Sequence, residues 1–513
     1  FLGAIFMPAP DRMKKLLTTP KKGETTDIMV GYSDYRKMEV GDNISDFYSK
    51  KYNLGEKYKD EAGKVHYKVL TADETMFRVK VMIGILFVAA LFWATGAVPI
   101  GITALVVGVF MYFMGVMQPN DVAQAYLKDS VIFIFGVLAF AVAITKTGLD
   151  RRIGIILLGS SKSIPMFLFI FLPLFAVACS FLSEHALVAF MMPVLMIIYV
   201  NAMQETGTKD DFKFAIMLFL AMNFAANSGG PGSPAAGGRN AIMLGILSDY
   251  GKAPTFGEWV QYGLPFVPVM AICIGAYFYF TGYRRSKVRH INVSNIVRNA
   301  SEKIGPMTKK EYITAAVLVL LVTLWITMSD TLGMGGPVIL ALVLLNIFRI
   351  LSWKNVSKIQ WEVVALYAAA TAMGKGLAAT GAALYLADSF IQILPDYLSS
   401  GEGLAIAVSA FTGIATNFMS DGAAVSAIGP ITVPMATISG TPAWMVGLTT
   451  AFASSFAHIL VIGTPNNAII YTMAKNPVTG ERLIKLSDFM KHGFMVFLIS
   501  MLVLWFWVIL GYW

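Results

Sequence analysis

From about residue 80 onward, the chain is a nearly continuous series of apolar blocks, each close to the length that spans a lipid bilayer. Hydrophobic residues make up 56% of the sequence and charged residues only 14%, whereas an ordinary soluble domain has about a quarter charged residues. The sequence therefore predicts an all-α polytopic membrane protein, in a plasma membrane or a bacterial inner membrane.

The apolar blocks occur twice in the same order. The first series has spans at 80–97, 101–117 and 131–147, an apolar block at 164–202, an interrupted segment at 212–250 and a span at 262–282. The second has spans at 312–328, 336–350 and 362–380, a block at 403–440, an interrupted segment at 445–473 and a span at 492–511. Each half has an odd number of full crossings, so the halves must be inverted relative to each other, as is typical of secondary transporters.

This order divides the chain into four parts: a polar N-terminal segment (1–78), a first inverted repeat (79–282), a basic linker (283–310) and a second inverted repeat (311–513). Placing the linker in the cytoplasm also places the other basic short loops there, including those with Arg151 and Lys475. This distribution follows the positive-inside rule, which accounts for the net charge of +9 without a nucleic-acid partner. The same count puts residues 1–78 outside the cytoplasm.

Each apolar block has polar residues at its centre. The block at 164–202 has about 39 residues, twice the length that a bilayer needs, and this favours a re-entrant helical hairpin over one long helix with a polar defect. The centres, Ser183-Glu184-His185 and Ser420-Asp421-Gly422, would then be the hairpin tips. Irregular backbone at membrane depth requires surrounding protein or an aqueous cavity.

The interrupted segments predict two broken transmembrane helices. The stretch NSGGPGSPAAGGRNAIML (Asn227–Leu244) and its counterpart VIGTPNNAIIY (Val461–Tyr471) place glycine and proline where a continuous helix does not tolerate them. Unwound carbonyls can ligate a cation, and the N-termini of half-helices attract an anion. Matching interruptions in two repeats therefore indicate a substrate site, whereas kinks used for packing would explain only one of them.

These motifs, in this order, resemble the divalent anion/sodium symporter family over most of 80–511. ATGAVPIGITALV, TKTGLDRRIGIILLG and MMPV are similar to signatures of the family's first half. The family's Gly-Gly-Thr-Gly-Thr…Pro-Asn loop aligns with Gly229 through Asn240, and GTPNNAIIY is similar to its Ala-Thr-Pro-Pro-Asn-Ala-Ile-Val pattern. The resemblance implies an elevator transporter, in which hairpins and broken helices slide against a scaffold that forms a homodimer. Family members carry dicarboxylates, citrate, sulfate or related anions, driven by Na⁺ or by exchange.

The chain departs from the family at the tips. The family has Ser-Asn-Thr at both hairpin tips, where Asn and Thr contact the substrate carboxylate and neighbouring groups bind Na⁺. Here the serines remain, but the acids Glu184 and Asp421 replace Asn, and His185 and Gly422 replace Thr. Arg239 also replaces a loop proline, and His458 precedes the second break where the family usually has an apolar residue.

Carboxylates at an anion site need neutralisation, because a like charge at 4 Å costs ~4 kcal/mol at an effective dielectric near 20. Three solutions remain open: protonated Glu184 and Asp421, which would give proton coupling; ionised carboxylates as Na⁺ ligands; or a substrate that itself carries positive charge. Arg239 either supplies a fixed positive charge for the anion or pairs with Glu184 as a buried salt bridge. His458 is either part of the site or a hydrogen-bonded core histidine.

We therefore predict a secondary active transporter of a small anion (dicarboxylate, sulfate or similar), coupled to H⁺ or Na⁺, with an elevator mechanism. No cofactor is expected beyond Na⁺ as a coupling ion, and the absence of a helical HExxH spacing argues against a metal enzyme. The expected substrate-binding residues are Ser183, Glu184, His185, Arg239, Asn240, Ser420, Asp421, Gly422, Thr464, Pro465 and Asn466. The expected coupling-ion residues are Glu184, Gly230, Asp421 and His458.

The expected partners are the anion, the lipid bilayer and a second copy of the chain. The alternative is a non-transporting membrane subunit or receptor that retains the transporter fold. The symmetrical gain of acids at both tips argues against this alternative, because decaying motifs usually acquire apolar or random residues.

Overall fold

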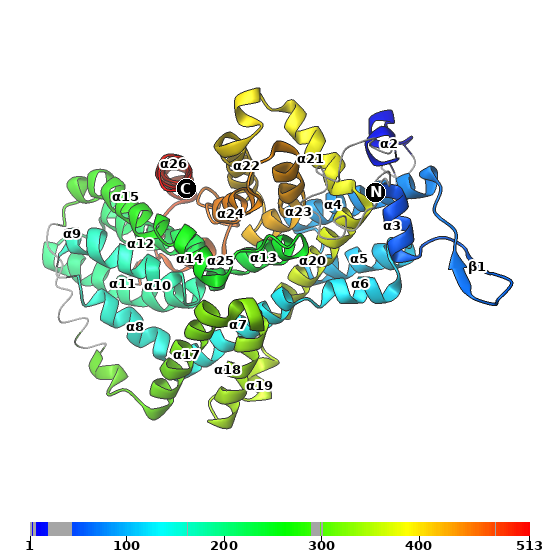
Figure 1. Cartoon of the computed structure of the whole chain (residues 1–513). Helices are drawn as coiled ribbons and strands as arrows, with labels where there is room; N and C mark the ends of the chain where they lie inside the picture. Colours follow the sequence, from blue (N-terminus) through cyan, green and yellow to red (C-terminus); the bar gives the residue numbers. More distant parts are fainter. Residues whose placement is uncertain are drawn as a thin grey trace.

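A computed structural model describes residues 3, 7–18, 44–161, 163–288, 298, 301–477 and 479–513, which fold almost entirely into helices (Figure 1). Within these ranges, nine helical segments are long and apolar enough to cross a membrane. The prediction of an all-α polytopic membrane protein is therefore confirmed. The only strands in the described part of the chain are β1 (Lys57–Lys59) and β2 (Val65–Tyr67), an antiparallel pair that projects from the bundle.

The helices follow the two series that the sequence predicts. Those before the linker are α2 (Asp11–Thr18), α3 (Ile44–Tyr52), α4 (Ala72–Thr95), α5 (Ile100–Phe113), α6 (Pro119–Tyr126), α7 (Asp129–Thr147), α8 (Leu149–Leu158), α9 (Ile164–Met166), α10 (Leu172–Cys179), α11 (Glu184–Thr206), α12 (Phe212–Ser228), α13 (Gly238–Asp249), α14 (Phe256–Gly263) and α15 (Phe266–Thr281). Those after it are α17 (Lys309–Leu332), α18 (Gly335–Ile347), α19 (Trp353–Val356), α20 (Trp361–Thr380), α21 (Ala382–Ile393), α22 (Gly401–Ala415), α23 (Asp421–Ser439), α24 (Ala443–Ser454), α25 (Pro465–Met473) and α26 (Leu486–Leu502).

Equivalent helices in the two series start and end with the same local chemistry. The first long helix of each series, α4 and α17, begins with a Thr-x-x-Glu capping box, formed by Thr71 and Thr308 with the glutamates three residues later. The third long helix of each series, α7 and α20, ends at a left-handed glycine, Gly148 (φ 84°) or Gly381 (φ 80°). A short helix, α8 or α21, follows each of these glycines, and the inverted repeat stays a prediction.

Each predicted hairpin is a helix–turn–helix in the structure. A helical segment that starts with α9, passes through a π-helical turn and ends with α10 is followed by a short turn and then α11. In the second series, α22 and α23 are joined in the same way. Two 3₁₀ turns separate α12 from α13, and irregular backbone separates α24 from α25. Re-entry of the hairpins from one membrane face stays a prediction.

Polar contacts bring together the loops that the charge pattern assigns to one side. Arg152 pairs with Glu311 at 2.7 Å, and Lys146 donates to the Ile350 carbonyl at 2.8 Å. At the other end of α7, Asp129 accepts from the backbone of Met334 at 2.8 Å. The two ends of the bundle therefore collect separate sets of loops, as a common membrane orientation requires.

The N-terminal segment contacts the end of the bundle that carries the turn after α5. Gln118 donates to the Asn53 carbonyl at 2.7 Å, and Tyr48 donates to the Val116 carbonyl. Arg12 pairs with Asp388 on α21. These contacts attach the described parts of residues 1–78 to the helical bundle, and their extracytoplasmic position stays a prediction.

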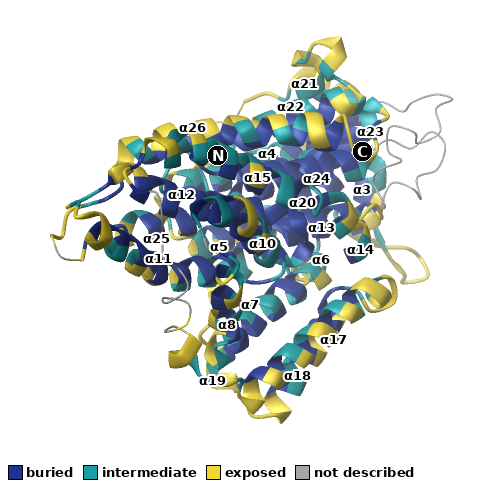
Figure 2. Cartoon of the chain, turned by 90° about the vertical axis from the view of Figure 1, so that its left-hand side faces the viewer, coloured by how far each residue is buried: buried dark blue, intermediate teal, exposed yellow. Residues whose placement is uncertain are grey.

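Burial separates central helices from peripheral ones. The segment Phe212–Gly232 is 89% buried over its apolar window, whereas α17 is only 22% buried. Figure 2 shows exposed residues along α17 and α18, at one edge of the molecule. Many are apolar, such as Val319, Ile326 and Val343, which suits contact with lipid or with another membrane protein. The broken helix α12–α13 therefore lies in the protein interior.

Candidate functional site

The two acids occupy identical positions at the starts of α11 and α23. Ser183 caps α11, with its hydroxyl accepting from the Ala186 amide at 3.4 Å, and Ser420 caps α23 by accepting from Ala423 at 3.3 Å. Serine is a favoured N-cap, and an acid in the first turn interacts favourably with the helix dipole. This chemistry explains locally why each tip carries a serine followed by a carboxylate.

Arg239 connects the two tips. It lies in the first turn of α13 and is only 2% exposed. Its Nη1 forms an ion pair with Asp421 and lies 3.5 Å from Glu184 Oε1. The structure therefore contains the buried ion pair between Arg239 and Glu184 that was one of the two alternatives from the sequence, and Asp421 is a second carboxylate paired with the same guanidinium.

Several buried polar atoms around this cluster have no hydrogen-bond partner among the described residues. They are Glu184 Oε2, Arg239 Nε and Nη2, Asn240 Oδ1 and Ser455 Oγ. Each such atom costs free energy if it stays unpaired. The cluster therefore has unused capacity to bind polar or charged groups.

The second break contacts the first hairpin tip. Thr464 caps α25 by accepting from the Asn467 amide at 3.3 Å, and Pro465 occupies the first helical position. Asn466 Oδ1 lies 2.7 Å from His185 Nδ1, and Asn466 Nδ2 donates to Asn227 Oδ1 at 2.9 Å. The site is thus built from both halves of the chain.

Asn467, which is not among the predicted site residues, is the centre of a buried amide network. Its Nδ2 donates to the carbonyls of Ala457 and Leu460, at 2.7 and 2.9 Å, within the second break. Its Oδ1 accepts from Asn223 at 2.8 Å and from Asn227 at 3.2 Å. The signal was present, since Asn223 and Asn227 are four residues apart on one face of α12.

Asn240 and Gly230 hold the first break together. Asn240 donates to the carbonyls of Gly230 and Ser233, at 2.8 and 2.7 Å. Neither Asn240 nor Gly230 is among the residues that line the cavity described next. Their observed contacts fix the backbone around Arg239.

His458 is also outside the cavity lining. It is fully buried, its Nε2 lies 3.2 Å from Ser500 Oγ, and its ring contacts Phe224 with centroids 5.1 Å apart. Its Nδ1 has no hydrogen-bond partner among the described residues. The contacts resemble those of the core histidine that the sequence left as one alternative.

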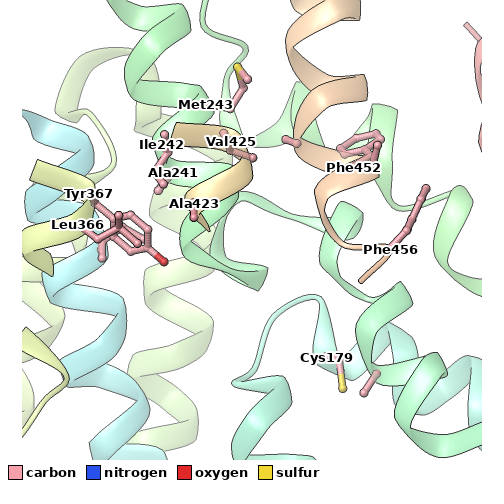
Figure 3. Close-up of a cluster of buried hydrophobic side chains, with 14 of the residues drawn as sticks. Cys179, Ala241, Ile242, Met243, Leu366, Tyr367, Ala423, Val425, Phe452 and Phe456 are labelled. Atoms are coloured by element: carbon pink, nitrogen blue, oxygen red, sulfur yellow. The ribbon is translucent and has the colours of Figure 1, made fainter. Parts of the chain in front are cut away.

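A cavity of about 240 Å³ lies between the tips and the helices α7, α17 and α20. Its polar wall contains both tip triplets, the segment 234–239 and Pro465. Tyr367 on α20 also lines it, and Figure 3 shows this ring extending from α20 toward α13. The other walls are largely apolar, so the cavity combines a few polar groups with a hydrophobic surround, as small-ligand sites do.

A second cavity, of about 350 Å³, lies beside the α13–α14 loop and the α17–α18 turn. Phe133 lines both cavities, and its ring meets that of Trp325 with centroids 5.3 Å apart. Trp325 donates to the Met334 carbonyl at 2.9 Å. An anchored aromatic pair therefore lies at the boundary between the two cavities.

The charge of the tip cluster limits what it can bind. The carboxylates of Glu184 and Asp421, when both are ionised, and the guanidinium of Arg239 together carry a net charge of −1. In the described part of the chain, no group of three His, Cys, Asp or Glu side chains could hold a metal ion. A Na⁺ ion would therefore need backbone carbonyls and hydroxyls as most of its ligands.

A membrane-spanning helical bundle with two helical hairpins and two broken helices meeting at one small cavity defines a secondary transporter. The chain belongs to the family described as the sodium:sulfate symporter transmembrane region, whose profile matches residues 75–513. The resemblance to divalent anion/sodium symporters is thereby confirmed. This is a family of transporters, so the protein is a multi-pass transporter and not an enzyme.

Individual relatives agree with this assignment. The sodium-dependent dicarboxylate transporter SdcS of Staphylococcus aureus, in strains NCTC 8325 and COL, is 25% identical over 446 residues, covering 81% of this chain and 82% of the relative. The crystal structure of the Alcanivorax borkumensis YdaH transporter matches with a TM-score of 0.50 at 13% identity, covering 91% of this chain and 96% of YdaH. At that identity, the structural likeness concerns the fold alone.

Proposed function

We propose that this protein is a secondary active transporter of a small anion, with C4-dicarboxylates as the first candidate substrates and sulfate as the second. The observation that carries this proposal is the convergence of two helix-start tips and two helix breaks on one cavity of about 240 Å³. The relative SdcS, named as a sodium-dependent dicarboxylate transporter, supports the substrate class. The cavity has room for a small organic anion.

Coupling to a cation follows from the charge of the site. An anion that approaches a cluster with net charge −1 is repelled by ~4 kcal/mol at 4 Å for an effective dielectric near 20. One H⁺ or one Na⁺ that binds with the anion removes this repulsion. The sodium-dependent relative favours Na⁺, whereas Glu184 and Asp421 in the tips favour H⁺.

We further propose an elevator mechanism in a homodimer. The moving unit would contain the hairpins and broken helices, and the scaffold would contain α4, α5, α17, α18 and α20. The aromatic pair Phe133 and Trp325 would separate the two cavities in the conformation described here. The proposed orientation places the linker in the cytoplasm and residues 1–78 outside.

Reconstituted proteoliposomes test the function directly. Uptake of labelled succinate and labelled sulfate would be measured with an inward Na⁺ gradient alone, a pH gradient alone and neither. We expect concentrative uptake of at least one anion under one of the two gradients. No uptake under any gradient, with a stable partner protein co-purifying, would support the alternative of a non-transporting subunit.

Replacing Asp421 by asparagine is expected to lower anion uptake by at least ~10-fold, because the ion pair that joins the second hairpin tip to Arg239 of the first break is lost. Glu402→Gln is the matched control, since Glu402 is an exposed acid on the same hairpin. Initial uptake rates, normalised to reconstituted protein, measure both. Equal rates for Asp421→Asn and the wild type would contradict a role of the second tip in transport.

A further inference from the structure

The guanidinium of Arg239 occupies a place where a small cation would be expected. It lies between two carboxylates that come from different hairpins, forming an ion pair with Asp421 and lying 3.5 Å from Glu184. The chain positions that bring these groups together, 184, 239 and 421, are far apart in the sequence. Two acids at matching helix starts are a natural binding site for one positive charge.

The surrounding glycines leave space for this group. A Cβ atom at Gly230 would lie 2.1 Å from Arg239 Nη2, and one at Gly237 would lie 2.9 Å from Nη1. Real Cβ atoms do not approach so closely, so a larger residue at either position would displace the end of the Arg239 side chain. The backbone of the first break therefore lies directly against the guanidinium.

Two atoms of the guanidinium have no partner in the described part of the chain. Nε and Nη2 are buried and unpaired, and Ser455 Oγ, which lies close to Gly230, is also unpaired. An arginine that served only to bridge two acids would be expected to use its planar fork on their oxygens. Arg239 instead uses Nη1 for both acids, so its other donors do not fix it in place.

We propose that Arg239 is a tethered cation, which takes the place of one coupling cation between the hairpin tips and remains with the protein when the substrate leaves. Its role in transport rests on the proposed function, whereas its occupation of a cation site does not. Under this proposal, the wild-type protein needs one free cation fewer per anion than a variant without Arg239. Removing the side chain would open a site for a small planar cation.

The first test uses stability in detergent. Arg239→Ala is expected to unfold at a lower temperature than the wild type, and 10 mM guanidinium chloride should restore part of the loss, whereas 10 mM choline chloride, whose cation is too bulky for the space of a guanidinium, controls for ionic strength. The triple variant Arg239→Ala/Glu184→Gln/Asp421→Asn should show no rescue, because its site has no charge to neutralise. Arg152→Ala, which removes an arginine paired with Glu311 elsewhere, is the control for unspecific effects.

The second test separates a coupling cation from a structural counter-ion. Arg239→Ala proteoliposomes are expected to recover anion uptake when guanidinium is present, and labelled guanidinium should enter together with the anion. Wild-type vesicles should carry no labelled guanidinium. Restored stability without entry of labelled guanidinium would overturn the proposal, because the site would then be structural.

A third test uses two further variants, so that the proposal can still be tested if Arg239→Ala does not fold. Arg239→Lys keeps the charge, and Arg239→Gln keeps much of the length without it. The proposal requires greater thermal stability and faster anion uptake for the lysine variant, and equal values for the two variants would overturn it. If wild-type vesicles take up no anion while the stability rescue holds, the proposed function fails and the cation site stands.

Discussion

Replacing Asn467 by leucine is expected to lower the free energy of unfolding by at least ~3 kcal/mol, since the Ala457 carbonyl and the amides of Asn223 and Asn227 each lose a partner, at about 1–3 kcal/mol per buried group. Leucine is similar in shape to asparagine but cannot donate or accept. The substitution would leave the carbonyls of Ala457 and Leu460 without this donor, and the amides of Asn223 and Asn227 without this acceptor. The network joins both broken helices, so transport should be lost as well.

The two cysteines provide the measurement. Cys179 is fully buried and Cys273 is partly exposed. In a Cys273→Ser background, a thiol-reactive dye therefore reports unfolding through the one remaining cysteine. The midpoint of the thermal transition would be compared between Asn467→Leu and this background.

Asn346→Leu is the matched control for this prediction. Asn346 donates to one carbonyl, that of Leu351, at 2.8 Å, and lies on the peripheral helix α18. We expect a much smaller shift for it than for Asn467→Leu. Similar shifts for the two variants would show that the amide network is not a principal source of stability.

Alanine at Gly263 or Gly493 is expected to displace a helix break and to remove transport. A Cβ at Gly493 on α26 would lie 2.0 Å from the His458 carbonyl oxygen, and one at Gly263 on α14 would lie 2.1 Å from that of Pro231. The contacted atoms belong to the backbone and cannot rotate away. Overpacking of this kind costs about 1–3 kcal/mol, and we expect values at the upper end.

Gly257→Ala is the control on the same helix as Gly263, because a Cβ there would have no neighbour within 4 Å. Thermal unfolding and anion uptake would be measured for all three variants. Gly257→Ala should match the wild type in both. Wild-type uptake by Gly263→Ala and Gly493→Ala would show that transport tolerates displacement of the breaks.

The paired glycines also bear on the internal repeat. In each series, a glycine on a late helix packs against a backbone carbonyl of the break in the same series. Gly263 on α14 lies against Pro231, and Gly493 on α26 lies against His458. The capping boxes at Thr71 and Thr308 and the left-handed glycines 148 and 381 add to this correspondence. The two halves thus use the same local solutions at matching positions.

The sequence alone determined the membrane class, the order of the helices and the family. These properties depend on hydrophobicity over about 20 residues and on the backbone preferences of glycine, proline and capping residues, which are local. The helix starts at Glu184, Asp421 and Pro465 follow from such local signals. The motifs GTPNNAIIY and TKTGLDRRIGIILLG carried the family resemblance for the same reason.

Only the tertiary structure decided which side chains meet. Arg239 contacts Asp421, 182 residues away, and His185 contacts Asn466, 281 residues away. The structure also showed that Asn467 is the centre of a buried hydrogen-bond network and that Tyr367 lines the cavity. His458 is fully buried. Such pairings depend on how the two halves pack against each other, and the local pattern of a single sequence carries no record of that packing.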